Sequence, residues 1–208
     1  MNHKLSVPQR KTHRVGVFVD VQNMYHSAKH LHGARVNFKE LLSIATAGRD
    51  LIRAVAYVVK SDTEEERAFF DALEKSGFEL KMKDLQVFAG GMKKADWDVG
   101  LAIDAISLSR QLDVVVVVSG DGDFEPLVNY LKHQGLIVEA VAFRRSTSSR
   151  LVDAVHNFID LDETAALMRS RRVAARGRRG ARAEHSEREA SEPRAIGTDT
   201  DGLDDTIS

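Results

Sequence analysis

Four aspartates follow predicted strands or open predicted helices, at positions where their carboxylates could meet: Asp20, Asp98, Asp121 and Asp123. Carboxylates that share one crevice repel each other, and a divalent cation relieves that repulsion. Because no convergent His or Cys accompanies them, their oxygens favour a hard ion, Mg²⁺ or Mn²⁺. Such an ion, or a pair about 3.5–4 Å apart, can activate water for phosphodiester hydrolysis. The four aspartates are therefore candidate metal ligands and catalytic residues, and Asn23 is a candidate hydrogen-bond donor to the substrate or to Asp20.

Each of these aspartates also has an interpretation without catalysis, because aspartate commonly caps helices. Asp20 and Asp123 could each precede a helix as its N-cap, and the helix dipole could stabilise Asp98 in the first turn of another helix. Asp121 and Asp123 place two carboxylates at one turn where a single cap would suffice, which favours the functional interpretation of the group. Asp104 stands about 120° around a helix axis from Asp98, so it either supports the site or is polar surface.

Four basic residues near the same predicted edge could bind a nucleic-acid backbone: Lys93, Lys94, Arg144 and Arg145. Lysine and arginine supply most protein contacts to phosphate. Ordinary solvated charge explains them equally well.

The segments that must position these residues alternate between strand-like and helix-like patterns. Strands are predicted at residues 15–19, 51–59, 78–82, 114–118 and 137–143, with a further short one at 85–88 and a loop after it. Helices are predicted at residues 23–29, 38–47, 63–75, 96–110 and 124–133, with Ser61 and Glu64 as a capping box and Asp96 as an N-cap. This order predicts an α/β fold with a mostly parallel, doubly wound sheet.

The valine run at residues 114–118 is apolar without alternation, as in a central strand buried on both faces. In open parallel sheets the functional crevice lies beyond the carboxyl ends of the strands. If this strand neighbours the first one, Asp20 and Asp121 converge at that edge.

Composition predicts one folded domain at residues 14–168 within the 208-residue chain, which is 43% hydrophobic. Residues 1–13 are expected to form a flexible basic arm, and residues 169–208 a disordered tail that is rich first in arginine and then in acid. The tail could bind a protein partner, and a homo-oligomer is possible. The absence of cysteine fits a cytoplasmic protein, and no apolar run is long enough for a membrane helix.

The motifs resemble the NYN domain family, in particular its LabA-like branch, which is related to PIN and FLAP nucleases. The similar segments are 17–23 (VFVDVQN), 98–105 (DVGLAIDA) and 119–127 (SGDGDFEPL). The resemblance implies a PIN-like sheet and a metal-dependent ribonuclease. The expected partner is RNA, in particular single-stranded RNA. It assigns the four aspartates to the acidic site, and Asn23 matches the asparagine of the family. Before the segment 158–161 (FIDL), where the resemblance implies an acid, this chain has His156 and Asn157 instead.

Two other functions compete with a nuclease. A non-catalytic regulator could use the same fold to bind RNA or a protein, although the intact acids argue against it. A receiver-like phosphotransfer domain would need a lysine at a later strand end, where this chain has Arg144 and Arg145 after Phe143.

Overall fold

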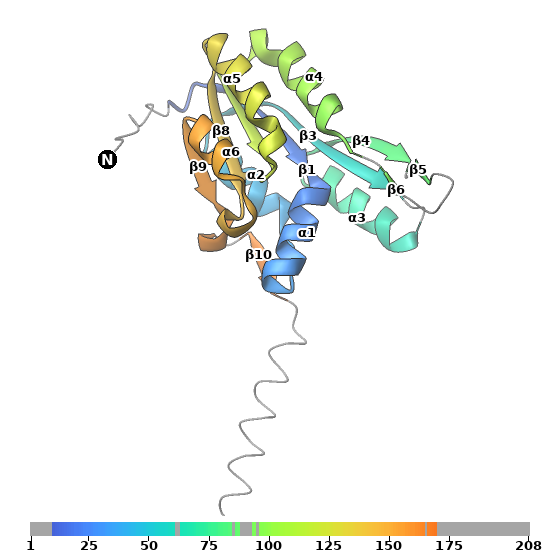
Figure 1. Cartoon of the computed structure of the whole chain (residues 1–208). Coiled ribbons are helices and arrows are strands. Elements are labelled where there is room, and N and C mark those ends of the chain that lie inside the picture. The colour runs from blue at the N-terminus through green and yellow to red at the C-terminus, as the bar shows by residue number, and fades with distance from the viewer. Residues whose placement is uncertain are drawn as a thin grey trace, which may run out of the picture. The chain divides into compact units, whose positions relative to one another are not determined.

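The computed structural model describes residues 10–60, 63–84, 86–87, 93–94, 96–164 and 166–169 (Figure 1). A six-stranded parallel sheet has the order β4 (Glu79–Asp84), β3 (Asp50–Lys60), β1 (Arg14–Asp20), β7 (Val114–Val118), β8 (Ile137–Ala142) and β9 (Asn157–Asp160). This topology confirms the predicted α/β class. Most of the expected arm and tail, residues 1–9 and 170–208, lies outside the described part, so their assignment stays a prediction.

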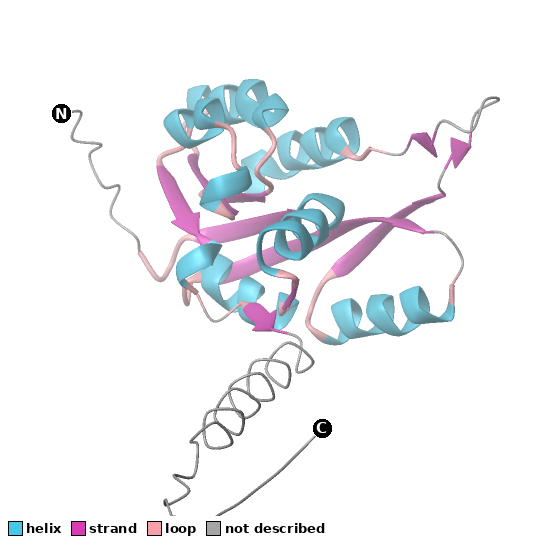
Figure 2. Cartoon of the chain, turned by 60° about the horizontal axis from the view of Figure 1, so that its bottom comes forward, coloured by secondary structure: helices cyan, strands magenta, loops and turns pink. Residues whose placement is uncertain are grey.

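Helices cover both faces of the sheet, as Figures 1 and 2 show. The core on one face includes apolar side chains from α1 (Val21–His32), α2 (Phe38–Thr46) and α3 (Glu64–Lys75). The core on the other face includes side chains from α4 (Asp98–Leu108), α5 (Glu125–His133) and α6 (Ser149–Ala154). Short 3₁₀ turns join these elements: η1 (Ser109–Gln111), η2 (Gly122–Phe124), η3 (Arg144–Ser146) and η4 (Leu161–Glu163). The sheet is therefore doubly wound.

The two central strands are buried because their side chains enter both cores in turn. In β7, Val116 and Val118 pack with the α1 side while Val115 and Val117 pack with the α4 side. Strands β1 and β7 are neighbours, with Val19 opposite Val118. This register brings the residues that follow the two strands to the same end of the sheet, as the sequence predicted.

The helix starts differ in two places from the predicted ones. The N-cap of α3 is Thr63, whose side chain accepts from the Glu66 amide at 3.3 Å, so the capping box on Ser61 was wrong; Ser61 itself lies outside the described residues. Asp96 is not the N-cap of α4. That helix begins at Asp98 behind Trp97, whose indole Nε1 donates to the Val58 carbonyl at 2.8 Å.

Two short antiparallel pairs lie outside the main sheet. Strand β2 (Ala34–Val36) pairs with β10 (Leu167–Arg169), and neither was predicted. Strand β5 (Gln86–Val87) pairs with β6 (Lys93–Lys94), so the two lysines that were expected in a loop lie on a strand. Their side chains fall outside the described part of the chain.

Candidate acidic active site

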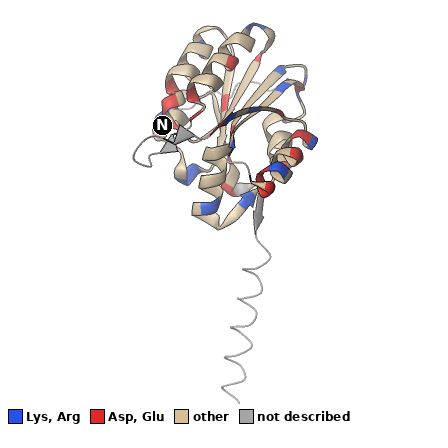
Figure 3. Cartoon of the chain, turned by 90° about the vertical axis from the view of Figure 1, so that its right-hand side faces the viewer, with Lys and Arg blue, Asp and Glu red and all other residues tan. Residues whose placement is uncertain are grey.

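A cavity of about 200 Å³ opens at the carboxyl ends of β1 and β7. Carboxylates, amides and aromatic rings from several segments line it: Asp20, Gln22, Asn23, Tyr57, Asp96, Trp97, Asp98 and Asp121. Figure 3 looks onto this end of the sheet with acidic residues in red. Three of the four candidate aspartates thus share one cavity although they come from distant parts of the sequence.

Asp20 combines a helix cap with a place in the cavity. One carboxylate oxygen, Oδ1, accepts from the backbone amide of Asn23 at 3.0 Å and caps α1. The other oxygen, Oδ2, accepts a long hydrogen bond of 3.4 Å from the hydroxyl of Ser119. Burial raises the pKa of Asp20, and these hydrogen bonds offset only part of that effect. Capping and a functional role therefore coexist at this residue.

Asn23 connects the two strand ends that carry the acids. Its side-chain Oδ1 accepts from the buried amide of Gly120 at 3.0 Å, which ties α1 to the loop after β7. The predicted donation to Asp20 comes from the Asn23 backbone and not from its side chain. Asn23 therefore positions Asp20 and Asp121 relative to each other.

Replacing Asn23 by Ala should lower the free energy of unfolding by about 1–3 kcal/mol, because the Gly120 amide would be buried without its acceptor. Urea denaturation monitored by circular dichroism measures the change. The matched control is Gln22→Ala, at the neighbouring cavity residue, with an expected change within about 0.5 kcal/mol. Equal effects of the two substitutions would contradict the connecting role.

The loop after β7 holds Asp121 through Ser119, a residue that the sequence analysis did not single out. Ser119 is fully buried, and its hydroxyl oxygen accepts from the Asp121 amide at 3.2 Å. Asp121 in turn accepts from the Asp123 amide at 2.9 Å. A polar residue directly after a buried apolar strand was the available signal, because a buried hydroxyl needs partners.

Close packing explains the two glycines in this loop. A Cβ on Gly120 would lie 3.0 Å from the Ser146 carbonyl oxygen, and one on Gly122 would lie 2.6 Å from the Ser148 hydroxyl. The Ser148 amide also donates to the Gly120 carbonyl at 3.0 Å. The glycines therefore let the acidic turn approach the segment after β8.

Asp98 experiences the strongest effect of the neighbouring acids. Burial, together with the charges of Asp20, Asp121, Asp96 and Asp123, raises its pKa to about 6. Asp123 is the outermost of the group: it does not line the cavity, its side chain is 78% exposed, and the Arg150 guanidinium lies 3.9 Å from its carboxylate. The structure thus gathers Asp20, Asp98 and Asp121, and places Asp123 at the rim.

The acidic cavity has the donor set for a hard cation. Burial and the repulsion between its carboxylates together raise the pKa of Asp98. Among the salt bridges between described residues, none joins Asp20, Asp98 or Asp121 to a basic side chain. Within the described residues, no group of three or more His, Asp or Glu side chains is arranged as a ready metal-binding centre. Carboxylate oxygens are the ligands that Mg²⁺ and Mn²⁺ prefer, so these acids are candidate metal ligands by donor type.

Asp104 is separated from the acidic group by its own partners. Its carboxylate accepts from the Tyr57 hydroxyl at 2.6 Å and from the Lys81 ammonium at 2.8 Å. Although burial acts in the opposite direction, these contacts lower the pKa of Asp104. Asp104 therefore anchors Tyr57, which lines the cavity.

Trp97 forms a wall of the same cavity. Its indole bonds to Val58, the ammonium of Lys83 lies 5.5 Å from the ring centre, and a Cβ on Gly100 would come within 2.7 Å of the ring. These contacts fix the ring of Trp97, which is the residue before α4, and so orient the start of that helix.

Arg144 and Arg145, two of the predicted phosphate-binding residues, do not line this cavity. Arg144 and Arg145 are exposed on η3, and the Arg144 guanidinium lies 5.4 Å from the centre of the Phe158 ring. His156 accepts a hydrogen bond from the Val138 amide through Nδ1 at 3.0 Å. Position 156 therefore supports strand β8.

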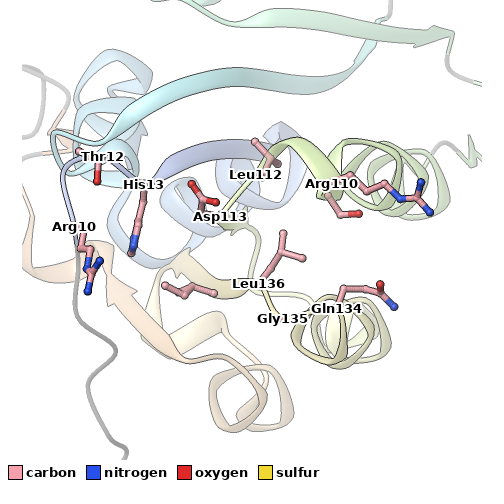
Figure 4. Close-up of a pocket in the computed structure, with 11 residues that line it drawn as sticks. Arg10, Thr12, His13, Arg110, Leu112, Asp113, Gln134, Gly135 and Leu136 are labelled. Carbon is pink, nitrogen blue, oxygen red and sulfur yellow. The ribbon is translucent and has the colours of Figure 1, made fainter.

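A larger cavity of about 550 Å³ lies at the opposite end of the sheet (Figure 4). Its lining includes Asp113, which the Arg14 guanidinium holds at 2.8 Å. This contact lowers the pKa of Asp113 to about 2. The charge of the acid in this cavity is balanced by an arginine, unlike the charges of the acids at the carboxyl end of the sheet.

Comparison with known proteins identifies the family. The chain is 28% identical over 159 residues to the low amplitude and bright protein LabA of Synechococcus elongatus. The matched region covers 72% of this chain and 84% of LabA. The crystal structure of VPA0982, a protein of unknown function from Vibrio parahaemolyticus, superposes with a TM-score of 0.71 at 31% identity and covers 78% of this chain and 100% of that one. In the described part, no helix is long and apolar enough to cross a membrane. A family model of the NYN domain matches residues 14–162, and the chain belongs to the NYN domain family.

Proposed function

We propose that this protein is a metal-dependent nuclease that hydrolyses phosphodiester bonds in RNA. The observation that carries the proposal is the meeting of Asp20, Asp98 and Asp121 around one cavity at the carboxyl end of the sheet. Membership of the NYN family supports it, because NYN domains are PIN-like nuclease domains. Burial and the neighbouring acids raise the pKa of Asp98, which supports the proposal because a bound cation would relieve the repulsion between these acids.

Asp20, Asp98 and Asp121 would hold the cation, with Asp123 at the rim as a further ligand or as a base that positions water. Bound Mg²⁺ or Mn²⁺ would supply a Lewis acid for the phosphate and lower the pKa of a coordinated water. Ser119 and Asn23 fix the acids through hydrogen bonds within the chain, so the carboxylates need little rearrangement. This preorganisation is what electrostatic catalysis requires.

The substrate would be single-stranded RNA. A cavity of about 200 Å³ can admit a phosphodiester from an extended strand more readily than a stacked duplex. Arg144 and Arg145 would contact neighbouring phosphates, because η3 ends at Ser146, beside Gly120 of the acidic turn. Lys93 and Lys94 are further candidates for contact with the RNA backbone.

Incubation of the purified full-length protein with end-labelled single-stranded RNA tests the function. We expect products with Mn²⁺ or Mg²⁺ and none with EDTA. RNA binding without product under any metal condition would show a non-catalytic RNA-binding regulator instead. If the protein neither binds nor cleaves the RNA, then RNA is not its substrate and the proposal fails.

Asp98 should destabilise the metal-free protein at neutral pH. Its pKa in the folded state, about 6, lies above the ordinary value of 3.8, so the folded protein holds this proton more tightly than the unfolded chain. Stability from this group is therefore present at pH 4 and is lost as the pH rises through 6. Asp98→Asn should raise the unfolding free energy by about 1 kcal/mol at pH 7.5, since partial exposure screens the effect, and by much less at pH 4. Urea titrations in EDTA at the two pH values check this, and a gain independent of pH would contradict it.

A further inference from the structure

Helix α1 begins where β1 ends (Figure 1), and one side of it continues from the acidic cavity onto the surface. Gln22 lines that cavity, and Tyr25 and Lys29 follow it at intervals of three and four residues, so the three lie along one side of the helix. Tyr25 is 46% exposed, and Lys29 is exposed as well. At a rise of about 1.5 Å per residue, Lys29 stands about 10 Å along the helix axis from Gln22. We call Gln22, Tyr25 and Lys29 the α1 row.

Neighbouring side chains hold the Tyr25 ring beside the helix without covering it. The Lys29 ammonium lies 5.5 Å from the ring centre, and the His26 ring meets the Tyr25 ring edge to face, with centroids 5.5 Å apart. These contacts limit the rotamer freedom that Tyr25 would lose on binding a ligand. Among the described residues of α1, Tyr25 is the only large apolar side chain that is exposed. One aromatic ring among polar groups suits the flat face of a nucleobase better than the apolar surface of a protein.

The charges of α1 and of its neighbour η3 favour a polyanion. The sequence of α1 contains no acidic residue, and Lys29 is exposed on it. The Ser146 hydroxyl donates to the Ser27 hydroxyl at 2.9 Å, which joins η3 to α1. Arg144 and Arg145 are exposed on η3. A nucleic-acid strand that enters the acidic cavity would therefore meet basic groups on both elements.

We propose that the α1 row binds the RNA segment next to the phosphodiester in the acidic cavity, with one base stacked on Tyr25 and a phosphate at Lys29. The inference rests on the proposed function, which places the reacting phosphodiester beside Gln22. The Gln22 amide can donate and accept, so it would contact the nucleotide at the edge of the cavity. Tyr25 can stack only on a base that is free of its neighbours, which selects single-stranded RNA over a duplex. Every base has an aromatic face, so this contact would not read the sequence.

Fluorescence anisotropy with a labelled single-stranded RNA tests the stacking contact. Full-length variants are compared in EDTA on the Asp20→Asn, Asp121→Asn background, so that cleavage does not consume the RNA. Tyr25→Ala should raise the dissociation constant more than about 5-fold, and Tyr25→Phe should leave it within about two-fold because the ring remains. Tyr130→Ala is the matched control: Tyr130 is 45% exposed on α5, outside the α1 row, and this variant should also stay within about two-fold.

An RNA backbone without bases separates the two contacts of the α1 row. On an abasic strand of the same length, Tyr25→Ala should no longer change the dissociation constant, because no base remains to stack. Lys29→Gln should weaken binding of both strands and should reduce the slope of log Kd against log salt concentration by about 0.7, the value for one phosphate contact on a single strand. Equal effects of Tyr25→Ala on both strands would overturn the stacking contact, and an unchanged salt slope in Lys29→Gln would overturn the phosphate contact.

The outcomes distinguish this inference from the proposed function. If Tyr25→Ala and Tyr130→Ala bind RNA alike while the unaltered protein cleaves it with Mn²⁺, the α1 row is not the RNA-binding surface and the nuclease proposal stands. If the unaltered protein neither binds nor cleaves RNA, both proposals fail.

Discussion

Replacing Asp20 and Asp121 together by Asn should reduce metal-dependent RNA cleavage more than about 100-fold. The two substitutions remove the charges on the adjacent strand ends that face the cavity. Asparagine still accepts the amide hydrogen bonds that Asp20 and Asp121 accept from Asn23 and Asp123, so the turns should persist. A loss of activity with an unchanged melting curve would therefore report the missing charges.

The control for this experiment is Asp113→Asn, an acid at the opposite end of the sheet that pairs with Arg14. This variant should cleave RNA at a rate within about two-fold of the unaltered protein, because surface charge pairs contribute little. Initial rates on labelled single-stranded RNA at saturating Mn²⁺ provide the comparison. Full activity in the Asp20→Asn and Asp121→Asn double variant would refute the assigned site.

Removing Arg49 should cause the largest loss of stability of any substitution considered. Its Nη2 donates to Glu139 at 2.7 Å, and the side chains are only 1% and 2% exposed. Arg49 also donates to the carbonyls of Ala45 and Thr46 at the end of α2. Arg49→Met would leave a carboxylate buried on β8, which costs about 3–5 kcal/mol of unfolding free energy.

Two further variants separate charge burial from packing in this experiment. Arg49→Met combined with Glu139→Met removes both charges and should recover most of the loss. Arg53→Met breaks the ion pair with Glu79, whose side chains are 45% and 43% exposed, and should cost less than about 1 kcal/mol. Urea denaturation measures all three. A cost for Arg49→Met no larger than that for Arg53→Met would contradict a structural role for the buried pair.

The sequence predicted five of the six strands of the main sheet, because burial leaves a strong pattern in them, and it missed β9 at the edge of the sheet. The valine run became β7, and its position beside β1 brought Asp20 and Asp121 together. Strands β2 and β10 are three residues long, too short for any periodicity to reveal. Asp96 was assigned as a cap from residue type alone, whereas the bond from Trp97 to Val58 sets where α4 begins.

The site was less predictable than the sheet, because its support comes from side chains distant in sequence. The role of Asp104 depends on Tyr57 from β3 and Lys81 from β4, which no spacing within α4 could indicate. The hydrogen bond from the Gly120 amide to the Asn23 side chain joins residues that are 97 positions apart in the sequence. Asp123 looked equivalent to Asp121 in the sequence, yet Asp121 is the N-cap of the 3₁₀ turn η2 and lines the cavity, whereas Asp123 lies within the turn and does not line it.

Manganese binding tests the central claim most directly, since it depends on the acids and not on the choice of RNA. Isothermal titration of the full-length protein with Mn²⁺ at pH 7.5 should give saturable binding that is abolished in the double variant Asp20→Asn with Asp121→Asn and retained in Asp113→Asn. Equal Mn²⁺ binding by the double variant and the unaltered protein, or none by either, would contradict an acidic metal site at the ends of β1 and β7.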